Sequence, residues 1–488
     1  MFNEIPNNIK VPLTYIEFDN SRAVQGTPAI PYKLLVMGQR LAVGTVAADV
    51  PILVTSEAQA EKYFGRGSML SAMIKALKKA NRFVELWAIA SDDNAGGVLA
   101  AGTVTPTGAA TAAGTIQLYI AGKKISVAVA VGDDGDAIAI NMAAAINAVT
   151  DLPVTAAVDG ITLNEVDVTA RHKGEVGNDI DMRVNYQIGE ELPAGITCPV
   201  VAMSAGTTNP DISTAIAAMG DEWYNVMVCP YTDATNLTAL ETEMTTRWGP
   251  TKQIDGQVFT AFRGSVGVTQ TFGDGRNSQH VSCMGTGISP TPPYIWAAVN
   301  AGVAAMSLSI DPARPLQTLF MPGVLPPAIT DRWTFEERNL LLGDGVATSI
   351  VDAGGRVLIE RQVTMYQENA FGVPDPSYLD VNTGATLSYL RYSTRARISL
   401  KFPRHKLASD GTRFGPGQKV VTPSVIRGEL IALFREWETA GLVENFEQFK
   451  EDLVVERDGN DANRVNVLAP PDLMNQFRVF AAQLQFIV

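Results

Sequence analysis

The sequence predicts a multidomain α/β (α+β) protein, in which a mixed sheet is flanked by helices, a mostly β domain is inserted, and each chain end is an extended strand arm. Short apolar strands alternate with amphipathic helices over residues 31–90 and again after Gly206. Between these stretches, residues 101–170 hold only nine charged side chains and have the turn pattern of hairpins. Both chain ends alternate apolar residues in the manner of strands.

The composition excludes several classes of protein. With 46% hydrophobic and 18% charged residues, the 488-residue chain is not intrinsically disordered. Its net charge of −13 argues against binding a nucleic-acid backbone with the whole surface. Three cysteines without a CxxC motif indicate a reducing compartment. The start of the chain lacks the basic and apolar regions of a signal peptide, so we expect a cytosolic product.

The first strand-like segment lies close to the N-terminus. Over Lys10–Asp19, one set of side chains faces one way and the other set the opposite way. Pro12 within it suits an edge strand or an arm exchanged with another subunit. The side chains that define the two faces of this segment are Val11, Leu13 and Tyr15 on one face, and Ile16 and Phe18 on the other.

Residues 31–90 then read as α/β. We expect a helix capped by Ser56 and running to Phe64, and a second helix over Met69–Ala80 capped by Ser68. Two strands are predicted before these helices and one after them, which implies a partly parallel sheet. The predicted strands are Tyr32–Met37, Ile52–Thr55 and Phe83–Ala90.

Residues 98–205 are predicted to form the inserted β domain. Its two hairpins turn at Ala121–Gly122 and at Asp159–Gly160, and an Ala-rich helix separates them. The expected strands are Thr115–Ile120, Lys124–Val131, Leu152–Val158, Ile161–Thr169 and Ile180–Ile188, and the helix is Asp136–Val149.

The α/β pattern resumes after Gly206, with Asp211 as the expected cap of a helix that ends at Met219. Strands are predicted over Tyr224–Pro230, Gln257–Arg263, Thr348–Val351, Arg356–Thr364, Leu453–Glu456, Arg464–Leu468 and Arg478–Val488. Helices are predicted over Thr235–Trp248, Pro292–Leu308, Gly384–Lys401 and Pro423–Ala440.

The sequence contains none of the common catalytic motifs. The sequence contains no P-loop, no GxGxxG and no GxSxG motif, and its three histidines are far apart. His280 and Cys283 are the nearest to a ligand pair, but a buried strand explains both better than zinc does. The cluster of Asp133, Asp134 and Asp136 lacks the spacing of a calcium loop and suits a turn at a helix start. We therefore predict no catalytic, cofactor or metal site.

Charge is distributed unevenly in the C-terminal part. No acidic residue lies between Asp380 and Asp410, and this gap holds the basic residues Arg391, Arg395, Arg397 and Lys401. Ten acids follow over residues 429–461, among them Glu444, Glu447 and Glu451. Patches of opposite sign on one chain favour head-to-tail contact between copies. A solvated basic helix face and an acidic loop explain the same pattern equally well.

The last residues have apolar side chains on both faces of the predicted strand. Such a strand needs cover on both faces and a partner at its edges. It either closes its own sheet or adds a strand to the sheet of a neighbouring subunit. One face carries Phe480, Ala482, Leu484, Phe486 and Val488.

Several stretches along the whole chain resemble the contractile tail sheath proteins of bacteriophages, most closely the Mu-like group. None of them is a catalytic motif, and their order and number carry the resemblance. They include VPLTYIEFDNSRA, YKLLVMGQ, VTSEAQAEKYFGRGSMLSAMIKALKKAN, ARHKGEVGNDI, YNVMVCPYTD, RISLKFPRHKLASDGTRFGPGQKVVTP and NRVNVLAPPDLMNQF.

The resemblance implies a domain plan. Residues 1–20 would be an N-terminal linking arm, 21–97 and 206–476 the two parts of the sheath core, 98–205 an outer domain, and 477–488 a C-terminal linking strand. The arms, Val11–Phe18 and Arg478–Val488, would join each subunit to its neighbours through shared sheets. One helix would face the inner tube, with Pro423–Ala440 as the first candidate and Gly384–Lys401 as the second.

The resemblance also implies a function. The subunits would polymerise helically around the tail tube in a metastable extended state, and contract to drive the tube through the host envelope. Expected partners are other copies in hexameric rings, the tail tube protein, and the baseplate and tail terminator proteins. No cofactor, direct nucleic-acid contact or membrane insertion is expected, and assembly would occur in the host bacterial cytoplasm. A sheath of a phage-derived or secretion-type injection machine is the alternative, and an α/β enzyme is a remote one.

Overall fold

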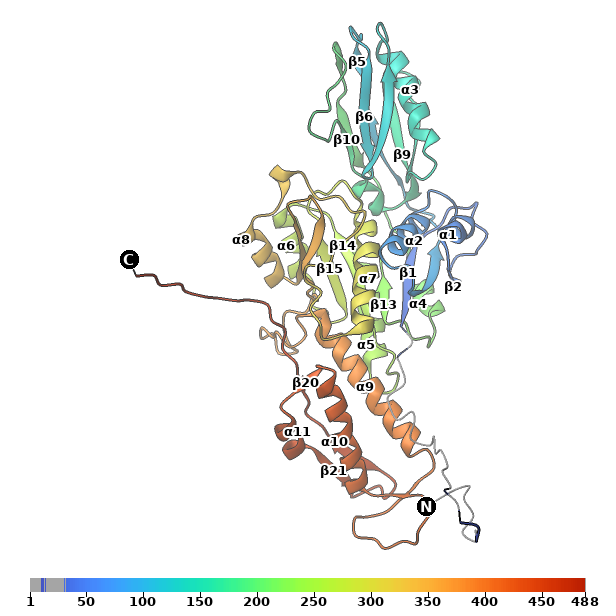
Figure 1. Cartoon of the computed structure of the whole chain (residues 1–488). Helices are drawn as coiled ribbons and strands as arrows, with labels where there is room; N and C mark the ends of the chain where they lie inside the picture. Colours follow the sequence, from blue (N-terminus) through green and yellow to red (C-terminus); the bar gives the residue numbers. More distant parts are fainter. Residues whose placement is uncertain (1–9, 13, 15–29, 31, 488) are drawn as a thin grey trace. The chain divides into compact units, whose positions relative to one another are not determined.

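The computed structural model describes residues 10–12, 14, 30 and 32–487 (Figure 1). Contacts between residues divide the chain into two compact units. The large unit comprises Tyr32–Ser388 together with Leu473–Val488, and the small unit contains Tyr389–Asp472. Helix α9 (Val381–Lys401) begins in the large unit and ends in the small one.

An eight-stranded mixed sheet forms the centre of the large unit, in the order β17-β16-β15-β14-β13-β1-β3-β2. The six inner strands pair in parallel, and the edge strands β2 and β17 are antiparallel to their neighbours. This confirms the predicted mixed sheet. The strands are β1 (Lys33–Gln39), β2 (Ile52–Leu53), β3 (Glu85–Ser91), β13 (Val226–Val228), β14 (Gln257–Phe262), β15 (Val281–Gly285), β16 (Val346–Val351) and β17 (Val357–Arg361).

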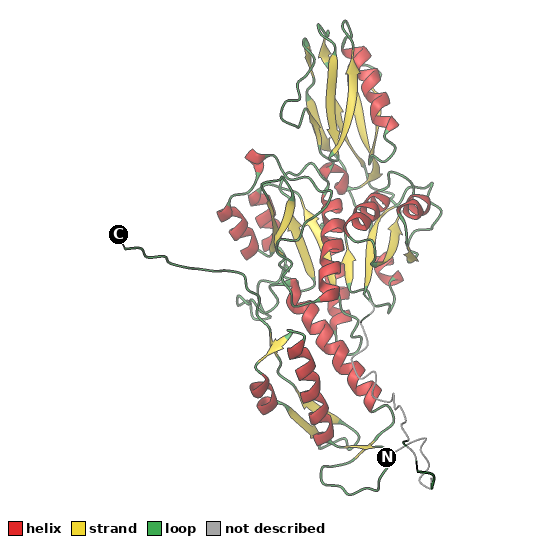
Figure 2. Cartoon of the chain, in the orientation of Figure 1, coloured by secondary structure: helices red, strands yellow, loops and turns green. Residues whose placement is uncertain are grey.

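Helices pack on this sheet (Figure 2). α2 and α7 contact each other as well as the sheet. α4 contacts α5 and β3, and α6 and α8 contact each other and β16. α7 has the length and hydropathy of a membrane span, but 67% of it is buried inside the protein, as in a core helix of a soluble fold. The helices are α1 (Glu57–Phe64), α2 (Met69–Ala80), α4 (Ser213–Ala218), α5 (Ala234–Trp248), α6 (Val266–Asp274), α7 (Pro293–Ile310) and α8 (Phe335–Gly343).

The first two helices begin and end where the sequence predicts. The hydroxyl of Ser56 accepts a hydrogen bond from the amide of Gln59 at 3.2 Å, and that of Ser68 accepts one from Ser71 at 3.1 Å. Each cap satisfies an amide that the first helical turn leaves without a partner. Gly65 ends α1 with a φ of 87°, which a residue with a side chain rarely adopts.

Residues of the predicted insertion form a second hydrophobic core with its own sheets, drawn in cyan and green in Figure 1. Ala121 and Gly122 both have positive φ, as a two-residue hairpin turn between β6 and β7 requires. The elements are β4 (Leu99–Val104), β5 (Thr107–Gly108), β6 (Gly114–Ile120), β7 (Lys123–Val129), α3 (Gly135–Ala148), β8 (Val154–Val158), β9 (Val166–Lys173), a 3-10 turn at Glu175–Asp179, β10 (Met182–Val184), β11 (Ile196–Thr197) and β12 (Val200–Ser204).

The small unit is built around α10 (Pro423–Thr439). Ile426, Leu430, Leu433, Phe434 and Trp437 point into its interior, at the spacing of one helix face. Phe434 stacks on Phe449 of α11 with ring centroids 4.1 Å apart. The remaining elements are α11 (Phe446–Asp452), β18 (Lys406–Leu407), β19 (Val420–Val421), β20 (Val443–Glu444), β21 (Val454–Arg457), β22 (Val465–Leu468) and β23 (Asp472–Leu473), which pairs with β20.

Two details of the sequence prediction are wrong. The second hairpin of the insertion does not turn tightly at Asp159–Gly160, because β9 begins only at Val166. Asp211 is not the N-cap of α4: Ile212 holds that place, and the Asp211 carboxylate accepts a hydrogen bond from the Ser213 amide instead. The described residues of the terminal segment Arg478–Val488 are not paired within their own subunit, so the predicted pairing of this strand with a neighbouring subunit stays a prediction.

Candidate functional site

The C-terminal segment after β23 is extended and projects from the large unit (Figure 1). Phe480 is 79% exposed and Ile487 fully exposed, and Ala482, Leu484 and Phe486 are exposed as well. Val488 lies outside the described residues. A run of exposed apolar side chains without a sheet partner is an interaction surface or an aggregation hazard.

The predicted N-terminal arm lies almost entirely outside the described residues, which include Val11 but not Leu13, Tyr15, Ile16 or Phe18. The Val11 side chain is 64% exposed. The pairing predicted for this arm therefore stays a prediction.

The basic part of α9 contacts acids of α10 within the small unit. Arg397 is only 6% exposed, and its guanidinium bonds to Glu436 and lies 3.5 Å from Glu429. Lys401, one helical turn later, lies 2.7 Å from the same Glu429 carboxylate. Arg397 and Lys401, which were both assigned to contacts between copies, thus have partners in their own subunit.

Sequence reasoning missed these partners, although their spacing was visible. Arg397 and Lys401 are four residues apart, and Glu429 and Glu436 are seven apart, so each pair lies on one face of its helix. Matching the two spacings indicates two helices packed side by side. The tryptophan Trp437 strengthens the same contact, since its indole N–H donates to Ser393 at 2.9 Å.

The other predicted charged residues lie nearer the surface. Arg391 is half-buried, and Arg395 is exposed on α9. Glu444 is half-buried in β20, whereas Glu447 and Glu451 are exposed on α11. Glu447 lies 3.4 Å from Lys450 on the same helix, which is a weak surface pair.

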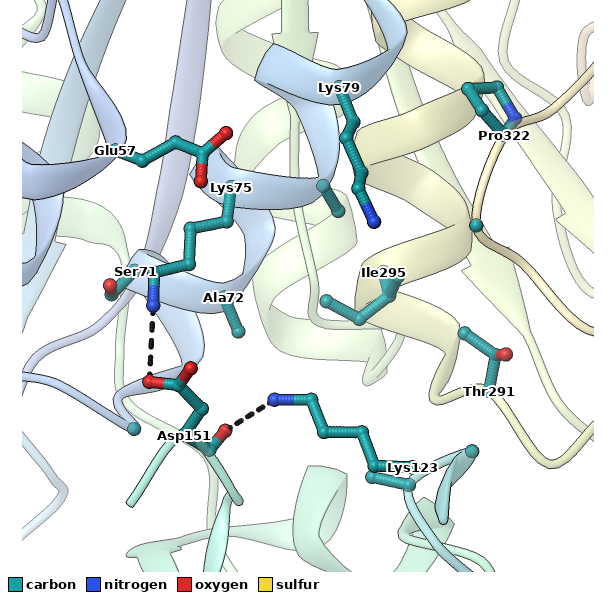
Figure 3. A pocket seen from close by; sticks show the side chains of 15 residues that line it. Glu57, Ser71, Ala72, Lys75, Lys79, Lys123, Asp151, Thr291, Ile295 and Pro322 are labelled. Atoms are coloured by element: carbon teal, nitrogen blue, oxygen red, sulfur yellow. Dashed lines mark hydrogen bonds and ion pairs between the residues drawn. The ribbon is translucent and has the colours of Figure 1, made fainter. Parts of the chain in front are cut away.

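One carboxylate connects the insertion to α2 and the preceding loop. Asp151 accepts a bond from Arg66 at 2.6 Å. It also accepts one from Lys75 at 3.1 Å, and its backbone carbonyl accepts one from Lys123 at 2.8 Å (Figure 3). These bonds, chiefly that from Arg66, lower the pKa of Asp151 to about 2. Asp151, Lys75 and Lys123 line a cavity of about 290 Å³, and both lysines bond to Asp151.

A second ionic contact lies at the base of the insertion. Arg183 bonds to Asp181 at 2.6 Å and donates to the carbonyl of Ile288, and Arg263 of the core reaches the same Asp181 at 2.8 Å. Burial raises the pKa of the neighbouring Asp179 to about 6. Charged groups therefore hold the insertion to the core at each of these places.

The ligand pair suggested by the sequence is part of the core. His280 precedes β15 and lies against Trp248, with ring centroids 5.6 Å apart. Cys283 is fully buried in β15, and burial raises the pKa of its thiol. Among the described residues, no three His, Cys, Asp or Glu side chains are grouped so that they could hold a metal ion.

Comparisons with known proteins identify the family of this chain. Family models described as "Phage tail sheath protein central domain" and "Phage tail sheath C-terminal domain" match residues 205–365 and 373–487. The "Mu-like prophage FluMu tail sheath protein" of Haemophilus influenzae is 50% identical over 487 residues, which are 100% of this chain and 99% of that protein.

Solved structures with low sequence identity are also similar. The sheath tail protein of Desulfitobacterium hafniense is 13% identical, with 95% of this chain and 97% of that chain covered and a TM-score of 0.49. The anti-feeding prophage helical sheath in its contracted state is 10% identical, with 98% of each chain covered and a TM-score of 0.45. The full-length identity to the Haemophilus protein decides the assignment: the chain belongs to the phage tail sheath proteins, a family of structural proteins and not of enzymes.

Proposed function

We propose that the chain is the repeating subunit of a contractile phage tail sheath, and that its C-terminal segment links each subunit to a neighbour. The observation that carries the linking role is the exposed apolar arm at Phe480–Ile487 in a protein of this family. A monomer that kept this segment in water would expose several large side chains, at a cost of about 25 cal/mol for each Å² of apolar surface. Pairing with another copy removes that surface from water.

The small unit offers a place for such an arm. Among the described residues, β21 and β22 pair only with each other, so both edges of this sheet lack a neighbouring strand. An isolated two-stranded sheet is marginally stable. Val454, Val467 and Leu468 are exposed on it. We propose that an arm from another copy adds a strand at one of these edges, so that backbone hydrogen bonds hold the subunits together.

The proposed mechanism uses these arms as tethers. The sheath assembles around the tail tube in an extended state that a kinetic barrier preserves. After a signal from the baseplate, the subunits rotate as near-rigid bodies and bury more surface against each other. Backbone bonds within the shared sheets survive the rotation, whereas side-chain contacts change. The energy is stored at assembly, so the mechanism requires no nucleotide.

The remaining assignments also belong to this proposal. The subunits form stacked rings, expected to be hexameric, in the virion tail, and they assemble in the host bacterial cytoplasm. The tube contact is assigned to α10 first and α9 second. The predicted domain plan, with 1–20 and 477–488 as arms, 21–97 and 206–476 as core and 98–205 as an outer domain, is retained. Baseplate and tail terminator proteins cap the two ends.

We also propose a charge contact between copies. Arg391 and Arg395 supply the basic side, and Glu444, Glu447 and Glu451 supply the acidic side, since Arg395, Glu447 and Glu451 are exposed. Arg397 and Lys401 contribute to it only indirectly, because they bind Glu429 and Glu436 of their own subunit.

Negative-stain electron microscopy of the concentrated protein tests the proposal. Hollow, striated tubes of uniform width are expected from the full chain, and monomers from a chain lacking residues 479–488. A chain lacking residues 1–20 should also stay monomeric. Discrete closed oligomers of the full chain, with or without tail tube protein, would contradict the sheath function. Long tubes from the shortened chains would contradict the linking role of the arms.

A further inference from the structure

A long exposed loop in the small unit connects β18 to β19. The two strands pair in parallel, and residues 408–419 between them form a connection about twice as long as is usual. All residues from Gly411 to Lys419 are exposed. Loops of this length without a helix or strand of their own usually have a function. Together with β18 and the two residues before it, this loop forms the segment 404–419, which we call the basic loop.

The basic loop carries an excess of positive charge. Its sequence contains four lysine and arginine residues and one acidic residue, in a chain whose net charge is −13. The four cationic side chains are exposed, and in the described part of the chain none of them forms an ion pair. They belong to Arg404, Lys406, Arg413 and Lys419. Because like charges within one loop repel each other, contact with an acidic surface would stabilise them.

The base of the basic loop is fixed, although its outer part is exposed. The Asp410 carboxylate accepts a hydrogen bond at 3.1 Å from the amide of Ser424 in the first turn of α10. The hydroxyl of Ser409 accepts one at 3.2 Å from the guanidinium of Arg457 in β21. The acidic residue of the loop therefore anchors it to the small unit, and the four cations stay available to a partner.

The same unit also carries an acidic surface. Glu447 and Glu451 of α11 and Glu456 of β21 are exposed. Among the described residues, Glu451 and Glu456 form no ion pair, and Glu447 has a weak surface pair with Lys450 at 3.4 Å. The subunit thus presents two surfaces of opposite sign whose charges are largely not neutralised within one chain.

We propose that the basic loop binds the acidic surface of a second copy, formed by Glu447, Glu451 and Glu456. This inference rests on the sheath function proposed above, and it adds a basic element that the contact assigned to α9 does not include. A contact between two different surfaces of one subunit is head-to-tail, so each copy uses its loop on one neighbour and its acidic surface on another. The contact can therefore repeat along a polymer. Phe414, which is 48% exposed in the loop, adds apolar area to it.

Charge reversal in the full chain tests the contact. Arg413→Glu combined with Lys419→Glu reverses two exposed cations of the loop. We expect the critical concentration for polymer formation, measured by sedimentation at low salt, to rise about tenfold, because attractive pairs become repulsive ones. The rise should shrink as added salt screens the charges.

A matched control separates the loop from the net charge of the chain. Lys62→Glu combined with Arg82→Glu changes the net charge equally at two exposed positions of the large unit, and should leave the critical concentration unchanged. An unchanged critical concentration in the loop variant, or an equal rise in the control, overturns the inference.

A mixing experiment identifies the surface that the loop binds. Glu447→Lys combined with Glu451→Lys reverses the acidic surface, and this chain alone should also assemble poorly. Mixed in equal amounts, the two reversed chains should assemble near the critical concentration of the unaltered chain, because each reversed loop then meets a reversed acidic surface. A folding defect would not be rescued in this way. A mixture that assembles no better than its components overturns the assignment of this acidic surface to the loop.

Tail tube protein provides the last comparison. If the loop-reversed chain polymerises normally by itself but does not assemble around added tube protein, the loop binds the tube and the inference is overturned. If the unaltered chain forms no polymer with or without tube protein, it is the proposed sheath function that fails. The two failures are therefore distinguishable.

Discussion

The indole N–H of Trp437 lies 2.9 Å from the hydroxyl of Ser393, and both side chains are buried in the small unit. The same hydroxyl donates to the Leu390 carbonyl at 3.0 Å. One small polar group thus satisfies both a helix carbonyl and the donor of a large side chain on α10. Since a buried donor without a partner is costly, this bond determines how the second half of α9 packs on α10.

The first prediction is that Ser393→Ala destabilises the small unit by about 1–2 kcal/mol, because it leaves the Trp437 N–H buried and unpaired. Urea unfolding followed by tryptophan fluorescence measures the change. In the Trp437→Phe background, Ser393→Ala should lower the free energy of unfolding by a smaller amount, because no indole donor is then left without a partner. Thr439→Ala is the control, because its side chain is exposed on the same helix and should matter little. Equal costs of Ser393→Ala in both backgrounds would contradict the coupling.

The second prediction separates a structural arginine from a surface arginine on one helix. Arg397→Glu places a third acid beside Glu429 and Glu436 at a buried position, so it should destabilise the small unit by about 3 kcal/mol or more. Arg395→Glu alters an exposed side chain and should leave the free energy of unfolding within about 0.5 kcal/mol.

Assembly of the Arg395→Glu variant then reports on contacts between copies without a folding defect. We expect its polymers to be weaker at low salt, and the difference to shrink as salt screens the charge. Normal polymers at every salt concentration would remove Arg395 from the interface. A fully stable Arg397→Glu subunit would contradict the packing of α9 on α10.

Local chemistry explains why the helices of the first α/β part could be predicted. Ser56 and Ser68 accept hydrogen bonds from amides three residues later, and Gly65 adopts a conformation that suits glycine, so each boundary depends on a few adjacent residues. The turn at Ala121–Gly122 has the same origin. Family membership could be predicted as well, because it rests on stretches distributed over the whole chain.

What could not be predicted depends on partners far away in sequence or outside the chain. Arg397 forms its ion pair with Glu436, which is 39 residues away in the sequence, only when α9 and α10 pack together. The terminal segment has the alternation of a strand, yet a strand exists only where an edge accepts it, and one subunit does not pair these residues. Its root at Arg478 depends on Asp380, 98 residues earlier, and no sequence pattern connects the two.

The third prediction concerns acid stability at the base of the insertion. The pKa of Asp151 is about 2, below its ordinary value of 3.8, because Arg66 and Lys75 stabilise the carboxylate. A depressed pKa contributes stability above pH 4 that is lost as the pH falls toward 2. Asp151→Asn should therefore lower the free energy of unfolding by about 1 kcal/mol at pH 7. Below pH 4 the free energies of unfolding of the variant and the unaltered chain should become more similar. Urea unfolding at a series of pH values measures it.

Arg66→Gln provides the partner variant for this site. It removes the strongest bond to Asp151, so it should weaken the same pH dependence without altering the carboxyl group itself. A difference between Asp151→Asn and the unaltered chain that is as large at pH 3 as at pH 7 would show that packing, and not charge, holds this contact.

The fourth prediction has the opposite sign and concerns Asp179. Burial, with a further contribution from Glu175, raises the pKa of its carboxyl to about 6 against the opposing effect of Arg263. Ionisation of Asp179 is therefore less favourable in the folded state than in the unfolded state. The resulting loss of folding free energy is absent below pH 4, grows between pH 4 and 6, and is complete above pH 6. Asp179→Asn keeps the shape without the charge, so it should stabilise the large unit by about 1–2 kcal/mol at pH 8 and hardly at all near pH 4.

Glu175→Gln is the matched variant, because it removes a nearby negative charge and leaves Asp179 in place. It should also stabilise the large unit at pH 8, by a smaller amount, because the ionised Asp179 then has one repulsive neighbour less. Thermal unfolding of the three chains at pH 4 and pH 8 measures both effects. If Asp179→Asn lowers the stability at pH 8, the attraction between the ionised carboxylate and Arg263 outweighs the cost of its burial.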